Sequence, residues 1–163
     1  MQITVSEGYR PGCVGRIAQL HAKHYSAFSG FGLAFEAKVA RELAEFCLNY
    51  QRGRDGIWLV LCNGEIEGSV AIDGSRADQG GAHLRWFITS DAIRGRGAGR
   101  QLLAHALRFA DERGYGSTFL WTFSGLGAAR HLYESHGFRL VHEGPGSQWG
   151  KVVVEQRFER DRS

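Results

Sequence analysis

A run of glycine and arginine residues in the middle of the chain has the composition of a phosphate-binding loop. It reads Arg94-Gly95-Arg96-Gly97-Ala98-Gly99-Arg100 and precedes a segment whose apolar residues, such as Leu103 and Leu107, recur at helical spacing. Glycines at a helix start let backbone N–H groups converge, and the helix N-terminus adds unpaired donors and partial positive charge. Arg94, Arg96 and Arg100 could add charge-assisted hydrogen bonds. The run therefore predicts a site for phosphate.

Two familiar phosphate loops do not fit this run. A dinucleotide fingerprint GxGxxG counted from Gly95 or Gly97 would need glycine at position 100 or 102, where Arg100 and Leu102 stand. The other loop, GxxxxGK(S/T), has no match anywhere in the chain. On the run alone, an incidental glycine-rich helix start remains an alternative.

The elements that would position the run follow from periodicity and from turn residues. Helices are predicted after Pro11, after Gly32, after the run up to Gly114, and over 128–136. Asn63-Gly64 between two apolar runs indicates a hairpin, because both turn positions need positive φ. Strands are expected at 2–6, 57–62, 66–72, 83–89, 117–123, 138–142 and 151–158. The order β-α-α-β-β-β-α-β-α-β-β predicts one α/β domain spanning residues 1–163.

The composition limits the partners and the compartment. The chain has 163 residues, of which 23 are glycine and only 2 proline, which argues for a globular domain rather than a disordered one. A net charge of +3 allows an anionic ligand but argues against nucleic acid as a partner. Three cysteines without metal-site spacing, no signal-peptide pattern and no membrane-length apolar run lead us to expect a soluble, cytoplasmic protein without a membrane or metal partner.

Two motifs together resemble the GNAT family of N-acetyltransferases. The glycine run fits the family's pyrophosphate motif, Gln/Arg-x-x-Gly-x-Gly/Ala. After the next predicted strand comes a second motif that is similar to the family's later helix: Ala129-Arg130-His131-Leu132-Tyr133-Glu134-Ser135-His136-Gly137-Phe138. The chain looks closest to the acetyltransferase domain that some bacterial MarR-type regulators carry. The shared residues are Tyr9-Arg10-Pro11-Gly12, His21, Tyr25, Phe35-Glu36, Leu84-Arg85 and Trp121-Thr122. A winged-helix segment is missing, so DNA binding is not carried over.

The resemblance implies a fold and an activity. The fold would be a mixed, mostly antiparallel sheet of six to seven strands flanked by about four helices. The activity would be transfer of the acetyl group of acetyl-CoA to a primary amine of a small-molecule or amino-acid-like acceptor, by direct attack and without a metal. A non-catalytic acyl-CoA sensor or interaction module is the alternative, and a homodimer is possible.

The resemblance also assigns residues to acetyl-CoA. The end of the strand at 83–89, with Phe87, Ile88 and Thr89, would supply backbone groups to pantetheine and to the acetyl carbonyl. Residues 94–100 would hold the pyrophosphate, and Arg130 would also contact the cofactor. Tyr133 would be the general acid that protonates the leaving thiolate, or else a packed aromatic residue. Ser124 stands near the position where many members have an asparagine that contacts pantetheine, and could substitute for it.

The acceptor side is less specified. His21 and Tyr25 lie on the first helix, and His21 is either a hydrogen-bonded core residue or a substrate contact. Glu36 and Arg85 would either form a buried ion pair or bind the amine and the acid group of an acceptor. His83 is a candidate general base, with a base acting through water as the alternative.

Overall fold

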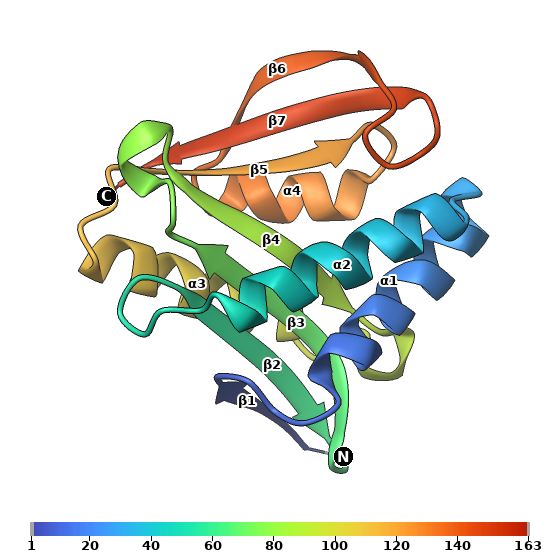
Figure 1. The fold of residues 1–163 in the computed structure, drawn as a ribbon, viewed down its shortest axis with the longest axis horizontal. Coiled ribbons are helices and arrows are strands. Elements are labelled where there is room, and N and C mark those ends of the chain that lie inside the picture. Colours follow the sequence, from blue (N-terminus) through green and yellow to red (C-terminus); the bar gives the residue numbers. More distant parts are fainter. Residues whose placement is uncertain (1, 163) are drawn as a thin grey trace.

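The computed structural model describes residues 2–162, and within them seven strands form one sheet in the order β1-β2-β3-β4-β5-β7-β6 (Figure 1). Every neighbouring pair is antiparallel except β4 and β5, which run parallel. The strands are β1 Ile3–Glu7, β2 Gly56–Cys62, β3 Glu65–Asp73, β4 Ala82–Thr89, β5 Ser117–Phe123, β6 Arg139–Gly146 and β7 Val153–Asp161. The helices are α1 Cys13–Ser29, α2 Leu33–Leu48, α3 Ala98–Glu112 and α4 Gly127–Ser135. The expected mixed, mostly antiparallel architecture is confirmed.

Helices cover both faces of the sheet, which explains why β2 is apolar at nearly every position. Ile57 and Leu59 pack in a core with Ile17 of α1 and Leu43 of α2. The alternate residues of β2, including Val60, pack in a second core with α3. A strand buried on both faces is a continuous apolar run rather than an alternating one. In residues 2–162, none of the helices has both the length and the apolar character needed to cross a membrane.

Local sequence signals predicted most boundaries of the helices and strands, but the last two strands have other boundaries than predicted. Asn63 and Gly64 both have positive φ, 52° and 78°, as the hairpin prediction required. β6 continues to Gly146 through Pro145, and β7 begins at Val153 rather than at 151. Because β6 is the edge strand of the sheet, the missing N–H of proline does not interrupt an interior ladder.

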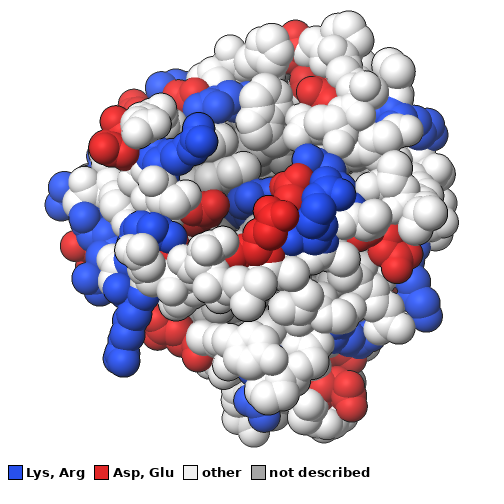
Figure 2. All heavy atoms as spheres, viewed as in Figure 1, with Lys and Arg blue, Asp and Glu red and all other residues white. Residues whose placement is uncertain are grey.

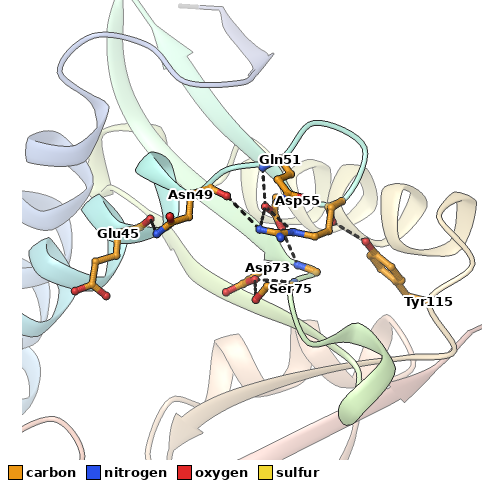
Figure 3. A network of polar contacts seen from close by, with 9 residues as sticks. Glu45, Asn49, Gln51, Asp55, Asp73, Ser75 and Tyr115 are labelled. Atoms are coloured by element: carbon orange, nitrogen blue, oxygen red, sulfur yellow. Dashed lines mark hydrogen bonds and ion pairs between the residues drawn. The ribbon is translucent and has the colours of Figure 1, made fainter.

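A buried carboxylate ties the start of β2 to its surroundings (Figure 3). Asp55 is 1% exposed, and its carboxylate accepts hydrogen bonds from the backbone N–H groups of Gln51 at 3.0 Å and Gly74 at 2.9 Å. The Arg54 guanidinium lies 2.8 Å from the same carboxylate, and the Tyr115 hydroxyl donates to the Arg54 carbonyl at 2.7 Å. The network joins the end of α2, the end of β3 and the segment before β5 on one side of the molecule.

Candidate active site

The two parallel strands at the centre of the sheet separate soon after they meet. β4 and β5 pair only at Ala82 with Thr118 and at His83 with Phe119. Beyond this point no pairing of β4 with β5 is present in the described residues, and the two strands diverge (Figure 1). After His83, the backbone N–H and C=O groups of β4 on the side of β5 therefore face an opening. There they can form hydrogen bonds with a ligand instead of with a neighbouring strand.

β4 carries an irregularity within this opening. Its register against β3 shifts between Ser69 and Ala71, and Trp86 has a φ of 50°, in the left-handed region that bulky residues rarely adopt. The Trp86 ring lies 5.4 Å from that of Phe46 on α2, whereas the ring of Phe87 lies 5.8 Å from that of Tyr133 on α4. Consecutive residues of β4 thus reach helices on opposite faces of the sheet.

A cavity of about 410 Å³ occupies the opening. It is walled by α1, α2, β4, β5, α4 and the loop between β6 and β7, from which Trp149 projects into the lining. Six of the residues that the sequence singled out meet here: His21, Tyr25, His83, Arg85, Phe87 and Tyr133. They come from three elements, α1, β4 and α4, that are far apart in the sequence, so the fold brings them together.

Tyr133 is a packed aromatic residue that also lines the cavity, and its role as general acid stays a prediction. Its side chain is 7% exposed and packs against the rings of Phe138 and Phe158, at centroid distances of 6.1 Å and 6.0 Å. Burial raises the pKa of the Tyr133 hydroxyl well above its ordinary value, so the group stays protonated at neutral pH. A packed phenol that keeps its proton can donate it to a strongly basic anion formed in the cavity.

The glycine run lies where α3 begins, and its glycines serve two different purposes. Gly95 and Gly97 have left-handed φ values of 78° and 74°, and Gly97 caps α3 with no side chain bonded to the helix start. The first N–H groups of α3 are therefore available to an anion. At Gly99 a Cβ atom would lie 3.1 Å from Leu132 and 3.2 Å from Phe87, so the absence of a side chain permits close packing of α3. Arg94 is exposed and paired with Asp91.

Of the two alternatives that the sequence left open for Glu36 and Arg85, the buried ion pair between them is not formed. Glu36 is exposed in the first turn of α2 and does not line the cavity, and Arg85 pairs instead with Glu42. Glu42 lies six residues further along α2, about 9 Å along the helix axis, where the helix passes β4. Lys38 approaches the same carboxylate at 2.6 Å. The sequence did contain a signal, because Lys38 and Glu42 are four residues apart and flank the buried Val39.

The charges around Glu42 keep it ionised. Burial raises the pKa of the Glu42 carboxyl, but the hydrogen bond from Lys38 and the charge of Arg85 outweigh this effect, and the pKa lies below its usual range. The cavity wall thus holds two cationic side chains and one carboxylate. Figure 2 shows basic and acidic side chains gathered near the centre of this face, where α2 crosses the sheet in Figure 1.

The two histidines of the cavity are both neutral. His21 is 6% exposed, and its Nδ1 donates to the Ile17 carbonyl at 2.8 Å, which leaves Nε2 as an acceptor. Burial lowers the pKa of His21 to about 4. His83 stacks on Phe119 at 4.4 Å, and burial together with the charges of Arg85 and Arg157 lowers its pKa to about 3. His83 is therefore a weaker base than an ordinary histidine.

Comparison with known proteins decides the family. The model of the Acetyltransferase (GNAT) family matches residues 17–138, a range that includes most of α1, the glycine run and α4. The chain belongs to the GNAT family. The family model is one of acetyltransferases, and GNAT acetyltransferases use acetyl-CoA as co-substrate.

Relatives and solved structures agree with this assignment. The chain is 31% identical over 115 residues to the N-acetyltransferase YjgM of Escherichia coli, covering 69% of this chain and 67% of YjgM. It is 35% identical over 86 residues to the N-acetylaspartate synthetase of Danio rerio, covering 53% of this chain and 30% of that protein, so it spans less than a third of that relative. A GNAT acetyltransferase of Staphylococcus aureus superposes with a TM-score of 0.79 at 17% identity, covering 99% of this chain and all of that one. YncA of Salmonella typhimurium, solved with acetyl-CoA, gives 0.75 at 18% identity, covering 99% and 94%.

The remaining residues that the GNAT resemblance assigned to acetyl-CoA lie outside the 410 Å³ cavity. Ile88, Thr89 and Arg94 line a neighbouring hollow of about 440 Å³ between the end of β4 and α1. Ser124 is exposed in the turn after β5, and its backbone N–H donates to the Val154 carbonyl at 2.9 Å. Arg130 on α4 lies 3.5 Å from Glu134 and places its guanidinium over the Phe158 ring. The cofactor roles of these residues stay predictions.

Replacing Gly97 by valine should weaken acetyl-CoA binding by about tenfold to a hundredfold. A β-branched residue disfavours the left-handed φ at Gly97, and relaxation of the backbone would turn the first N–H groups of α3 away from the pyrophosphate. Isothermal titration calorimetry with acetyl-CoA measures the change. Gly8→Val is the matched control, because Gly8 has a φ of 97° and open space around it but lies between β1 and α1. Equal losses in both variants would contradict the prediction.

Stability should fall as the solution is acidified from pH 6.5 towards pH 4. The pKa of His21 in the folded protein, about 4, lies below its ordinary value of 6.5, so in this range the unfolded chain binds a proton that folded His21 does not. This difference favours unfolding by about 3 kcal/mol at the acid end. Denaturant unfolding at several pH values measures the slope. His21→Gln should reduce the slope, and the part that comes from His83 should remain. His131→Gln, at an exposed position, should leave the slope unchanged; the opposite pattern would refute the assignment.

Proposed function

We propose that this GNAT enzyme acetylates the primary amine of an amino acid or a similar small molecule that carries an acid group. The observation that carries the proposal is the ion-paired group of Arg85, Glu42 and Lys38 in the cavity wall. Two cations against one carboxylate leave the wall with an excess of positive charge. Such a wall fits an acceptor that brings both an ammonium group and a carboxylate.

The roles of the charged residues follow from their chemistry. Arg85 offers a planar fork of donors that matches a carboxylate, and its side chain is 21% exposed, so it can reach a ligand in the cavity. Glu42 can hold the incoming ammonium group until that group loses its proton. The names of the relatives support this view, since N-acetylaspartate synthetases by name act on an amino acid with two carboxylates. Acidic amino acids are therefore the first acceptors to test.

The reaction needs few protein groups. Acetyl-CoA supplies the activated thioester carbonyl. The amine gives up a proton to water or to a neutral imidazole of the cavity, His21 or His83, and attacks directly. Tyr133 returns a proton to the sulfur that leaves. Aromatic walls that include Phe87 and Trp149 exclude water and strengthen the charge interactions inside the cavity.

A thiol-release screen tests the proposal. Purified enzyme with acetyl-CoA is offered amino acids, the corresponding amino acid amides, polyamines and short peptides. Release with amino acids and at least tenfold weaker release with the amides would support an acid-binding cavity. Preference for polyamines or peptides would contradict it. Calorimetric binding of acetyl-CoA with no release from any amine would favour the non-catalytic sensor.

The finer features of the resemblance are also proposals. We propose a cytoplasmic enzyme that is related to the acetyltransferase domain of MarR-type regulators. The support for a reducing compartment is the cysteine usage of the sequence, since Cys13, Cys47 and Cys62 are odd in number and match no zinc or CxxC spacing. The mixture of both charge signs on the face shown in Figure 2 gives no support to a nucleic-acid partner. A homodimer remains a proposal that light scattering can test.

A further inference from the structure

Two consecutive side chains of β4 lie on the same face of the sheet. Successive side chains of a regular strand point to opposite faces. Arg85 reaches Glu42 of α2, and the next residue, Trp86, packs on Phe46 of the same helix. The Arg85 guanidinium lies 4.2 Å from the centre of the Trp86 ring, a stacked arrangement that regular pleating would not allow.

A β-bulge produces this arrangement, at a cost in backbone conformation. Ser69 pairs with Ile88 and Ala71 pairs with Arg85, so Val70 alone stands opposite both Trp86 and Phe87. The extra residue restores the alternation after the bulge, and Phe87 returns to the α4 side. Trp86 absorbs the irregularity with its φ of 50°. A bulky residue in this region is strained, and it remains there only when neighbouring groups hold it.

The hydroxyl of Ser69 is the neighbouring group that holds the bulge. It donates a hydrogen bond of 2.6 Å to the carbonyl oxygen of Trp86, from the adjacent strand β3. Ser69 is fully buried, with an exposure of 0%. Removal of the hydroxyl would leave the displaced carbonyl without this donor.

We propose that Ser69 is a positioning residue for acceptor recognition. By holding the bulge carbonyl, it keeps Trp86 beside Arg85 and so fixes the guanidinium at the wall of the cavity. A one-residue slip of β4 would turn Trp86 to the opposite face and remove the surface on which Arg85 stacks. The inference rests on the proposed function, because it takes Arg85 as the group that binds the acid group of the acceptor.

Ser69→Ala should reduce selectivity rather than activity in general. We expect the KM for an amino acid to rise by about tenfold, and the preference for that amino acid over its amide to fall by a similar factor. The Kd of acetyl-CoA should rise by clearly less than the KM for the amino acid, since the glycine run at α3 is untouched although Phe87 and Ile88 lie beside the bulge. Ser69→Cys keeps a weaker donor of similar size, so it should reduce selectivity in the same direction but by a smaller factor. This second variant tests the inference if the alanine variant does not fold.

Thr118→Val is the matched control. Thr118 is 1% exposed on β5, it does not line the cavity, and its replacement also removes a buried hydroxyl. A merely structural role for Ser69 predicts the same result for both variants, namely a lower melting temperature with unchanged selectivity. That result would overturn the inference.

Amide hydrogen exchange gives a readout that needs no acceptor. The amides of residues 85–88 should exchange about tenfold faster in Ser69→Ala and at the wild-type rate in Thr118→Val. Unchanged exchange in Ser69→Ala would overturn the inference whatever the acceptor. A third result separates the two proposals: exchange is faster in Ser69→Ala, but the wild-type enzyme shows no preference for acid-bearing acceptors. In that case Ser69 does hold the bulge, and the proposed function is wrong.

Discussion

Tyr133→Phe should lower kcat by about a hundredfold and change the Kd of acetyl-CoA by less than about twofold. The leaving thiolate needs a proton, and Tyr133 lines the cavity with its hydroxyl protonated, because burial raises its pKa. Phenylalanine keeps the ring contacts with Phe87, Phe138 and Phe158, so the helix should remain in place. Steady-state thiol release and calorimetry measure the two quantities.

Tyr25→Phe is the matched control for this substitution. Tyr25 lines the same cavity, and burial raises its pKa to about 12, but the GNAT motif does not include it. Its ring packs edge-on against Phe35 and Phe123 at 5.5 Å and 5.7 Å, contacts that phenylalanine would preserve. A large loss of kcat in Tyr25→Phe with wild-type turnover in Tyr133→Phe would assign the proton donor to α1 instead of α4.

Arg85→Met should lower kcat/KM for an acid-bearing acceptor by about a hundredfold, and for an amine without an acid group by only a few-fold. Methionine keeps much of the apolar stem that lies against Trp86 but removes the donors and the charge. Lys38 would still neutralise Glu42, at 2.6 Å, so the carboxylate is not left without a cation. Kinetics with an amino acid and its amide separate the two acceptor classes.

Arg157→Met controls for the loss of a nearby positive charge. Arg157 stacks over Phe119 at 4.0 Å and contributes to the low pKa of His83, but it does not line the cavity. Its replacement should leave the preference for acid-bearing acceptors intact. If Arg85→Met lowers kcat/KM equally for both acceptor classes, Arg85 supports the fold of the cavity and the proposed acid-binding role is wrong.

The features that the sequence predicted well depend on neighbours in the chain. The positive φ values at Asn63-Gly64 and at Gly95 and Gly97 follow from residue types within a few positions. The amphipathic repeat after Gly99 predicted α3, and the motif around Tyr133 placed a tyrosine in a helix that the structure puts at the cavity. Periodicity and turn chemistry are local properties, so the printed sequence contains them.

Other features were decided only when distant segments came together. Which acidic residue of α2 meets Arg85 depends on where α2 crosses β4, and the answer is Glu42 rather than Glu36. The bulge at Trp86 depends on the register of β4 against Ser69, a residue 17 positions earlier in the chain.

By itself, therefore, the sequence predicted the family, the order of elements and the glycine run before α3, whose phosphate role stays a prediction. The tertiary structure determined the charge pairs of the cavity, because strand register and helix crossing arise from packing across the whole core and leave no mark on short-range spacing.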